Sequence, residues 1–250
     1  MAGDCARNDK VRPTVKPFLA ADWRYLAMLN YMVDPATLAG RIPPGTELDY
    51  ENGETFLSVV GFLFLNTRLL GLPIPMHRDF EEVNLRFYVR KKSADTWRRG
   101  VVFVREFVPR RAISMIARAF YGEPYSALPM KHDIEDRDGR VRVEYSWRRG
   151  RKWESLKMEA SGAPQNIPAG SHAEFITEHY WGYTAIREGC SEYRVNHPRW
   201  KVWNVESFDF SADVAALYGP QFVEALGQPP RSAFIADGSP ITVERRSILE

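Results

Sequence analysis

The sequence has few cysteines and few lysines. The shortage of cysteine excludes a protein stabilised by a disulfide framework, and the shortage of lysine bears on which catalytic groups the chain can offer. Two cysteines in 250 residues, Cys5 and Cys190, cannot form a disulfide framework, and neither belongs to a Cys-x-x-Cys pair. We therefore expect a reducing, cytoplasmic setting. Of the 34 basic residues, 26 are arginine and 8 are lysine. The imbalance matters because lysine can serve as a nucleophile whose pKa the protein tunes, whereas arginine stays charged.

Long hydrophobic runs and an excess of one charge are also missing. The longest apolar stretch, residues 59–65, is far shorter than the roughly 20 residues of a membrane-spanning helix. Residues 1–16 lack the apolar segment of a secretory signal, so we expect neither a signal peptide nor a membrane partner. The net charge of +2 argues against nucleic acid as a partner. We interpret the arginine pairs, such as those at 98–99, 110–111 and 148–149, as solvated strand ends.

The common catalytic motifs are absent as well. The sequence has no Gly-x-Gly-x-x-Gly, no phosphate-binding Gly-Lys-Ser/Thr, no Gly-x-Ser-x-Gly and no His-Glu-x-x-His. The closest approach to a metal-ligand pattern is His172, Glu174, Glu178 and His179. Because Ser171 and Glu174 already match a helix capping box, we predict neither a metal nor another cofactor.

What the chain does contain is enough apolar material for a core. Hydrophobic residues make up 44%, and no linker or repeat divides the sequence. We predict a frayed tail over residues 1–17 and a single domain over 18–250.

The hydrophobic pattern predicts strands more often than helices. The expected strands are 23–33, 48–50, 55–67, 82–91, 101–108, 130–135, 140–147, 152–160, 183–186, 193–197, 202–210, 232–236 and 241–245. Asn52-Gly53 and Asp138-Gly139 predict hairpin turns. The expected helices are 34–40, 110–121, 171–179 and 214–226. The class is therefore α+β, mostly β, either a barrel or a sandwich with a few packed helices.

Two segments are the best candidates for a site. On the strand 82–91, alternation places Val83, Leu85, Phe87 and Val89 on one face and Glu82, Asn84, Arg86, Tyr88 and Arg90 on the other. A polar face on a long strand is either solvated or lines a wet cavity. In the second segment a helix ends at Gly122, and Pro124 stiffens the chain that follows. Such a corner holds side chains at a defined place.

Several stretches resemble the YqjF-like family of uncharacterised bacterial proteins, which is grouped with the acetoacetate decarboxylase-like superfamily. They are WRYLAMLNY (23–31), VDP (33–35), PPGTEL (43–48), FEEVNLR (80–86), RE (105–106), PRR (109–111) and EHYW (178–181). The resemblance runs from about residue 18 to 245 and implies a cone-like β-barrel with a central cavity. It does not imply an activity.

The resemblance also implies a test of mechanism. The decarboxylases carry an aromatic-Gly-bulky-Pro-Lys-Lys pattern, and a lysine beside a second lysine forms a Schiff base with the keto acid. Here the run Tyr121-Gly122-Glu123-Pro124-Tyr125-Ser126 has hydroxyl groups at both lysine positions. Met32 lies near the position of a family arginine. Glu82 matches a family glutamate that faces the cavity.

These observations lead to one preferred hypothesis and several open alternatives. The preferred reading is a small-molecule-binding barrel, with acid/base rather than Schiff-base chemistry on a small carbonyl or carboxylic compound if it is an enzyme. The predicted catalytic residues are Glu82, Glu123 and Tyr125, and the predicted binding residues are Asn84, Arg86, Tyr121, Met32 and Arg118. A non-catalytic ligand-binding or sensing protein is the first alternative, and a decarboxylase that uses Lys131 is the second. A homo-oligomer remains open.

Overall fold

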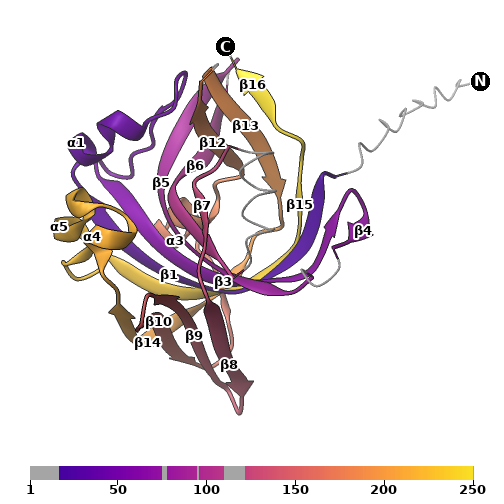
Figure 1. Ribbon diagram of the computed structural model, residues 1–250, viewed down its shortest axis with the longest axis vertical. Helices are drawn as coiled ribbons and strands as arrows, with labels where there is room; N and C mark the ends of the chain where they lie inside the picture. Colours follow the sequence, from indigo (N-terminus) through magenta and orange to yellow (C-terminus); the bar gives the residue numbers. More distant parts are fainter. Residues whose placement is uncertain (1–16, 75–77, 95, 110–121, 188, 250) are drawn as a thin grey trace, which may run out of the picture.

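The computed structural model describes residues 17–74, 78–94, 96–109, 122–187 and 189–249, and over these residues the chain is mostly β-sheet, as predicted (Figure 1). The strands are β1 Leu19–Val33, β2 Glu47–Leu48, β3 Thr55–Leu69, β4 Leu72–Pro73, β5 Phe80–Ser93, β6 Thr96–Val108, β7 Tyr125–Ala127, β8 Met130–Arg137, β9 Arg140–Arg149, β10 Lys152–Ser161, β11 Gln165–Asn166, β12 Trp181–Ile186, β13 Gly189–Asn196, β14 Lys201–Ser211, β15 Ser232–Val243 and β16 Ser247–Leu249. The helices are α1 Pro35–Leu38, α3 His172–Thr177, α4 Val214–Leu217 and α5 Val223–Leu226, with 3₁₀ turns at Ala39–Arg41 and Pro220–Phe222.

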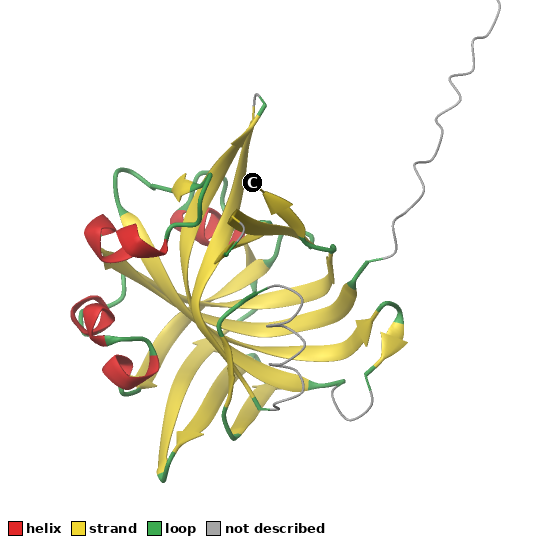
Figure 2. Cartoon of the chain, turned by 45° about the horizontal axis from the view of Figure 1, so that its top comes forward, coloured by secondary structure: helices red, strands yellow, loops and turns green. Residues whose placement is uncertain are grey.

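Seven strands form a closed ring. The hydrogen-bonded order is β13-β12-β6-β5-β3-β1-β15, and β15 pairs with β13 again at Val243 and Val195. The sheet then continues from β15 through β14, β10, β9 and β8, which extend beneath the ring in Figure 1. A second view shows the same strands splaying away from the ring (Figure 2). We call β8, β9 and β10 the outer leaf.

Two separate cores follow from this arrangement, because each ring strand has two faces. One core lies between the outer face of the ring and the outer leaf. In it, Leu29, Val59 and Leu85 of the ring pack with Trp147 and Leu156 of the outer leaf. Helices α4 and α5 add apolar side chains to this core. The other core faces the interior of the ring and includes Met28, Val60, Phe62 and Tyr88. The alternation predicted for strand 82–91 is therefore confirmed, with Leu85 and Tyr88 in different cores.

The structure confirms the predicted helix caps and one predicted hairpin turn. Asp34 caps α1 by accepting a hydrogen bond from the amide of Ala36. Ser171 caps α3 in the same way, although the Glu174 carboxylate accepts from the amide of Gly170 rather than from Ser171. Asp138-Gly139 joins β8 to β9 as predicted. The predicted helix 110–121 lies outside the described residues.

The predicted hairpin at Asn52-Gly53 is wrong in its pairing. The turn exists, with positive φ at both residues and a single bridge between Glu51 and Glu54. The preceding strand β2 nevertheless pairs with β5 instead of β3. The reason is that β3 already has β1 and β5 on its two edges.

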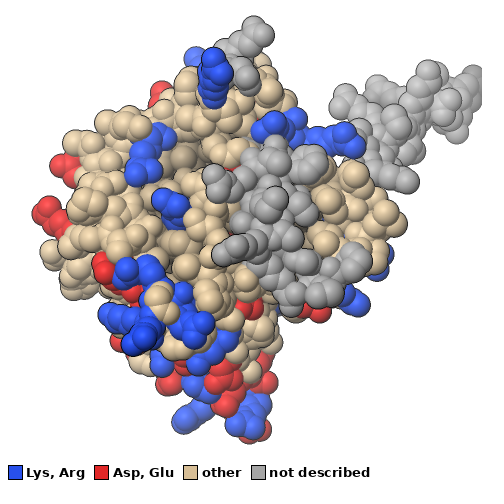
Figure 3. Space-filling view, in the orientation of Figure 1, with Lys and Arg blue, Asp and Glu red and all other residues tan. Residues whose placement is uncertain are grey.

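The surface charge is mixed. Figure 3 shows Lys and Arg interspersed with Asp and Glu over the lower part of the face, where Figure 1 places the outer leaf. Ion pairs of the outer-leaf arginines include Arg142 with Asp133 at 2.7 Å and Arg149 with Asp213, which precedes α4, at 2.6 Å. That nucleic acid is not a partner stays a prediction. Among the described residues, no helix has the length and apolarity that crossing a bilayer requires.

Candidate functional site

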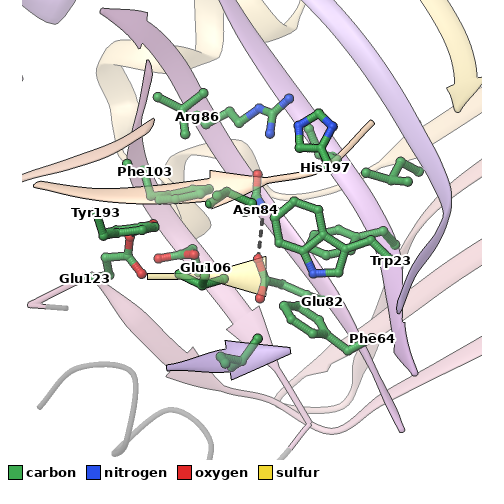
Figure 4. A pocket seen from close by; sticks show the side chains of 18 of the residues that line it. Trp23, Phe64, Glu82, Asn84, Arg86, Phe103, Glu106, Glu123, Tyr193 and His197 are labelled. Carbon is green, nitrogen blue, oxygen red and sulfur yellow. Dashed lines mark hydrogen bonds between the residues drawn. The ribbon is translucent and has the colours of Figure 1, made fainter. Parts of the chain in front are cut away.

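The interior of the ring holds a cavity of about 340 Å³ (Figure 4). Its wall is mostly apolar and comes from β1, β3, β5, β6, β12, β13 and β15, with Trp23, Phe62, Phe64, Phe80, Phe103 and Trp200 among the large side chains. The polar members are Thr67, Glu82, Asn84, Arg86, Glu106, Glu123, Tyr125, Thr177, His179, Tyr193 and His197. A mostly apolar cavity of this size with a few convergent polar groups is typical of a small-molecule site.

One end of the cavity holds a cluster of three buried carboxyl groups. Glu82 comes from β5 and Glu106 from β6, while Glu123 directly precedes the short strand β7. Strand β7 pairs in parallel with β6, so that Tyr125 lies beside Glu106. The predicted corner after Gly122, whose φ is 75°, therefore delivers Glu123 and Tyr125 to the same place as Glu82. We call Glu82, Glu106 and Glu123 the carboxyl cluster.

Hydrogen bonds hold two members of the carboxyl cluster. The Tyr125 hydroxyl donates to Oε2 of Glu82 at 3.0 Å, and Nδ2 of Asn84 donates to Oε1 at 3.0 Å. The Tyr193 hydroxyl donates to Oε1 of Glu123. Tyr193 fits here because Gly182 on the neighbouring strand has no Cβ, which would collide with the Tyr193 ring.

Burial makes these carboxyl groups hard to ionise. It raises the pKa of Glu82 to about 7, although hydrogen bonds from Asn84 and Tyr125 and the charge of Arg86 act the other way. Burial also raises the pKa of Glu123 to about 8 against the hydrogen bond from Tyr193. The pKa of Glu106 is raised well above its usual value by burial and then by Glu123 and Glu82. The carboxyl cluster therefore holds exchangeable protons at neutral pH.

The other end of the cavity is marked by Arg86, with His197 beside it in Figure 4. The Arg86 guanidinium lies over the Tyr88 ring, 5.7 Å from its centroid, and the residue is 9% exposed. It forms no hydrogen bond or ion pair with any residue that the structure describes, and its Nε is a buried atom without a partner. His197 stacks on Trp200, and burial lowers the pKa of His197, so this histidine adds no charge at neutral pH.

Of the eight predicted site residues, the structure brings five together around the cavity. Glu82, Asn84, Arg86, Glu123 and Tyr125 line it. Tyr121 and Arg118 lie outside the described residues. Met32 shares the inward face of Met28 and Asn30 but lies near the end of β1, where it is 49% exposed and does not line this cavity, so its binding role stays a prediction.

The structure places Lys131, on which the second alternative depends, away from the cavity. Lys131 belongs to β8 in the outer leaf, where its ammonium lies 4.9 Å from the centroid of the Trp153 ring. It does not line the cavity, and no other described lysine does. The four residues of the weak metal pattern bind different partners, for example His172 with Glu51 and His179 with Asp49.

Sequence reasoning missed six polar residues of the site, which are Thr67, Glu106, Thr177, His179, Tyr193 and His197. The inward orientation of Glu106 could not be predicted from alternation, because β6 contains a β-bulge. Val101 and Phe103 face the cavity, so strict alternation would place Arg105 there next; the register shift opposite Leu85 and Arg86 brings Glu106 inward instead. Arg105 points outward and donates to Ser126 at 3.1 Å. His179 lies in the EHYW stretch that carries part of the family resemblance, but this stretch does not indicate a role in the site for the histidine.

Comparisons with known proteins agree on family and fold. The model of the DUF2071 family, described as "Uncharacterized conserved protein (COG2071)", matches residues 20–240. The uncharacterized protein YqjF of Bacillus subtilis (strain 168) is 28% identical over 190 residues, which are 74% of this chain and 75% of that protein.

Solved structures extend the likeness in fold. Acetoacetate decarboxylase from Legionella pneumophila superposes with a TM-score of 0.64 at 14% identity and covers 97% of this chain and 94% of its own. The enduracididine biosynthesis enzyme MppR, complexed with pyruvate, has a TM-score of 0.64 at 14% identity and covers 100% and 99%. An acetoacetate decarboxylase-like enzyme from Sphingomonas wittichii RW1 has a TM-score of 0.61 at 16% identity and covers 97% and 98%. The expected acetoacetate decarboxylase-like fold is thus confirmed.

Proposed function

We propose that this chain, which belongs to the DUF2071 family of uncharacterized conserved proteins, binds a small carboxylic acid in its internal cavity. The carboxylate pairs with Arg86, and the rest of the ligand extends along β5 toward the carboxyl cluster. The volume of about 340 Å³ suits a small ligand of this kind.

The unpaired guanidinium of Arg86 is the observation that carries the proposal. Arginine stays charged in proteins, and a charge that is largely removed from water is stabilised by an opposite charge beside it. No described residue forms an ion pair with Arg86, and the charge of Glu82 acts on it without a direct contact. A ligand carboxylate would supply one through paired, charge-assisted hydrogen bonds. An anionic ligand would therefore stabilise the charge of Arg86 inside the cavity.

Acid/base chemistry is the finer part of the proposal. A carboxylate at Glu82, with a pKa of about 7, can take a proton from a carbon next to a carbonyl, while Glu123, with a pKa of about 8, can give one to the carbonyl oxygen. The Tyr125 hydroxyl, which donates to Glu82, helps to orient that carboxylate. No lysine lines the described part of the cavity, so imine formation has no residue to support it there.

The binding part is tested with Arg86→Met and a matched control. We expect pyruvate, acetoacetate or propionate to raise the Tm of the wild-type protein, whereas the corresponding uncharged amides do not. Pyruvate and acetoacetate are taken from the names of proteins that share the fold, and propionate is a small acid without a keto group. Arg86→Met should weaken binding by at least about tenfold. Arg90→Met, on the same strand but paired with Glu47 at 2.7 Å, should bind like the wild type.

Two outcomes would contradict the binding proposal. One is that none of these acids stabilises the wild type. The other is that Arg86→Met and the wild type respond equally. Loss of folding does not confuse the result, because removal of an unpaired buried charge should leave the free protein at least as stable.

A further inference from the structure

A second buried unit adjoins the Arg86 end of the cavity and has no part in the proton transfer described above. Nε2 of His179 lies 3.0 Å from Oδ2 of Asp49, and the same oxygen accepts a 2.6 Å hydrogen bond from Nε of Arg99. The Asp49 amide donates to the carbonyl of Tyr88, which fixes this residue to β5. Both side chains of the pair are almost fully buried, at 1% exposure for His179 and 5% for Asp49. The imidazole is therefore held rigidly.

The partners of His179 determine its tautomer. Hydrogen bonds from His179 and Arg99 keep the pKa of Asp49 low despite burial, so Asp49 is ionised and can only accept. The shared hydrogen must lie on Nε2 of His179. Burial also lowers the pKa of His179 to about 4, so the ring is neutral at pH 7. Nδ1 then carries a lone pair and no hydrogen.

That lone pair has no donor among the described residues. Nδ1 of His179 and Oδ1 of Asn84 are both buried atoms without a hydrogen-bond partner, and both residues line the cavity. His179 packs on the Tyr88 ring at 4.7 Å between centroids, and Arg86 lies over the same ring. This part of the cavity therefore offers one cationic donor, Arg86, and two acceptors without a hydrogen-bond donor, Nδ1 of His179 and Oδ1 of Asn84. An isolated carboxylate satisfies the donor but leaves both acceptors unmatched.

We infer that the ligand carries a hydroxyl group close to its carboxylate, and that this hydroxyl donates to Nδ1 of His179. The ligand class is therefore a small hydroxy acid, and Asp49 is the positioning residue that sets the tautomer of His179. This inference rests on the proposed function, because the carboxylate pairs with Arg86. It adds a specificity that Arg86 alone cannot give, since a site built for a hydroxyl rejects the analogue that lacks it.

The test compares acids that differ by one hydroxyl. Dissociation constants are measured by calorimetry for propionate, 2-hydroxypropionate and 3-hydroxypropionate. We expect one of the hydroxy acids to bind the wild type at least about tenfold tighter than propionate. His179→Phe keeps an aromatic ring in an aromatic setting. This variant should bind the hydroxy acid and propionate with about equal affinity. His172→Phe is the matched control, because His172 also bonds a carboxylate and stacks on Phe175 but does not line the cavity.

The outcomes separate this inference from the proposal beneath it. If all three acids bind with equal affinity and need Arg86, the hydroxyl inference is wrong and the carboxylate site stands. If none binds, the proposed function fails first. If the preference for a hydroxy acid survives in His179→Phe, the assignment to His179 is overturned.

A measurement on the wild-type protein keeps the inference testable if His179→Phe does not fold. Nitrogen-15 NMR of labelled histidine should show His179 as the neutral Nε2–H tautomer at pH 7, with an Nδ1 resonance that moves when the hydroxy acid binds and moves less with propionate. A hydrogen on Nδ1 in the free protein would overturn the inference.

Discussion

Glu82 and Glu123 are the residues on which the choice between catalyst and binding protein rests. Both are buried beside Tyr125, and burial raises the pKa of both, to about 7 and about 8. Two coupled carboxyl groups that both titrate near neutral pH can share one proton, so that one accepts a proton while the other donates one, which is the combination that acid/base catalysis requires. Pyruvate, a minimal keto acid that lacks the inferred hydroxyl, should bind weakly, and at saturating concentration we expect the protein to exchange the methyl protons of pyruvate with deuterium from the solvent, with a bell-shaped pH profile centred between 7 and 8. Proton NMR in deuterated buffer measures the rate.

Glu82→Gln should lower that exchange rate by about 10² to 10⁴, the usual contribution of a general base. Glu81→Gln is the control, since Glu81 is the neighbouring residue and is similarly buried but bonds His132 rather than the cavity groups. An exchange rate no faster than buffer would contradict acid/base catalysis. With carboxylate binding intact, that result would favour the non-catalytic alternative.

At the scale of elements, the shape of the cavity depends on a bulge in β1. Tyr25 has a φ of 52°, and the register of β1 against β3 shifts between Arg24 and Ala27. The bulge allows both Trp23 and Leu26, which are three residues apart, to line the cavity. Opposite it on β15, Gly238 has a φ of 78° and packs directly against the Trp23 backbone. Only glycine fits this contact.

Gly238→Ala should therefore destabilise the protein more than its φ alone explains. The new Cβ would collide with the carbonyl of Trp23, in addition to the left-handed strain of about 1–2 kcal/mol. Gly53→Ala measures the strain alone, because Gly53 has a φ of 84° and a Cβ added there would meet no atom within 4 Å. We expect urea unfolding to give Gly238→Ala an additional loss of about 1–3 kcal/mol. Equal losses in the two variants would show that β1 and β15 adapt without cost.

The same elements show what could be predicted from sequence. Alternation over residues 82–91 found the polar cavity face of β5, and the Gly122-Pro124 corner found Glu123 and Tyr125. Both signals are local. The bulge in β6 that turns Glu106 inward leaves no glycine or proline as a sign, and the Asp49–His179 contact joins residues that are 130 positions apart. The fold class could be predicted from the number of expected strands and from the family resemblance. Closure of the ring could not be predicted from local patterns, because it depends on long-range pairs such as Val195 with Val243.

For the whole molecule, the cavity makes stability depend on pH in an unusual direction. Carboxyl groups with folded pKa values raised from 4.5 to about 7 and about 8 bind more protons in the folded chain than in the unfolded chain. Their stabilising effect is present at low pH and is lost as the pH rises through the folded values. His179, lowered from 6.5 to about 4, acts in the opposite sense, since stability rises with pH until the unfolded histidine is neutral. The two effects oppose one another between about 4.5 and 6.5.

Above pH 6.5 the opposing effect of His179 ends, and the carboxyl cluster dominates. We expect the free energy of unfolding to fall between pH 6.5 and 8, by up to about 1.4 kcal/mol per pH unit for each proton that the folded state holds in excess. His132, whose pKa is raised by its hydrogen bond to Glu81, acts in the same direction. The double variant Glu82→Gln/Glu123→Gln mimics the protonated groups and should flatten this slope, while Glu159→Gln, at an exposed position of β10, should leave it unchanged. Urea unfolding at four or five pH values measures the slope; a double variant with the wild-type slope would mean that these carboxyl groups do not hold their protons in the folded protein.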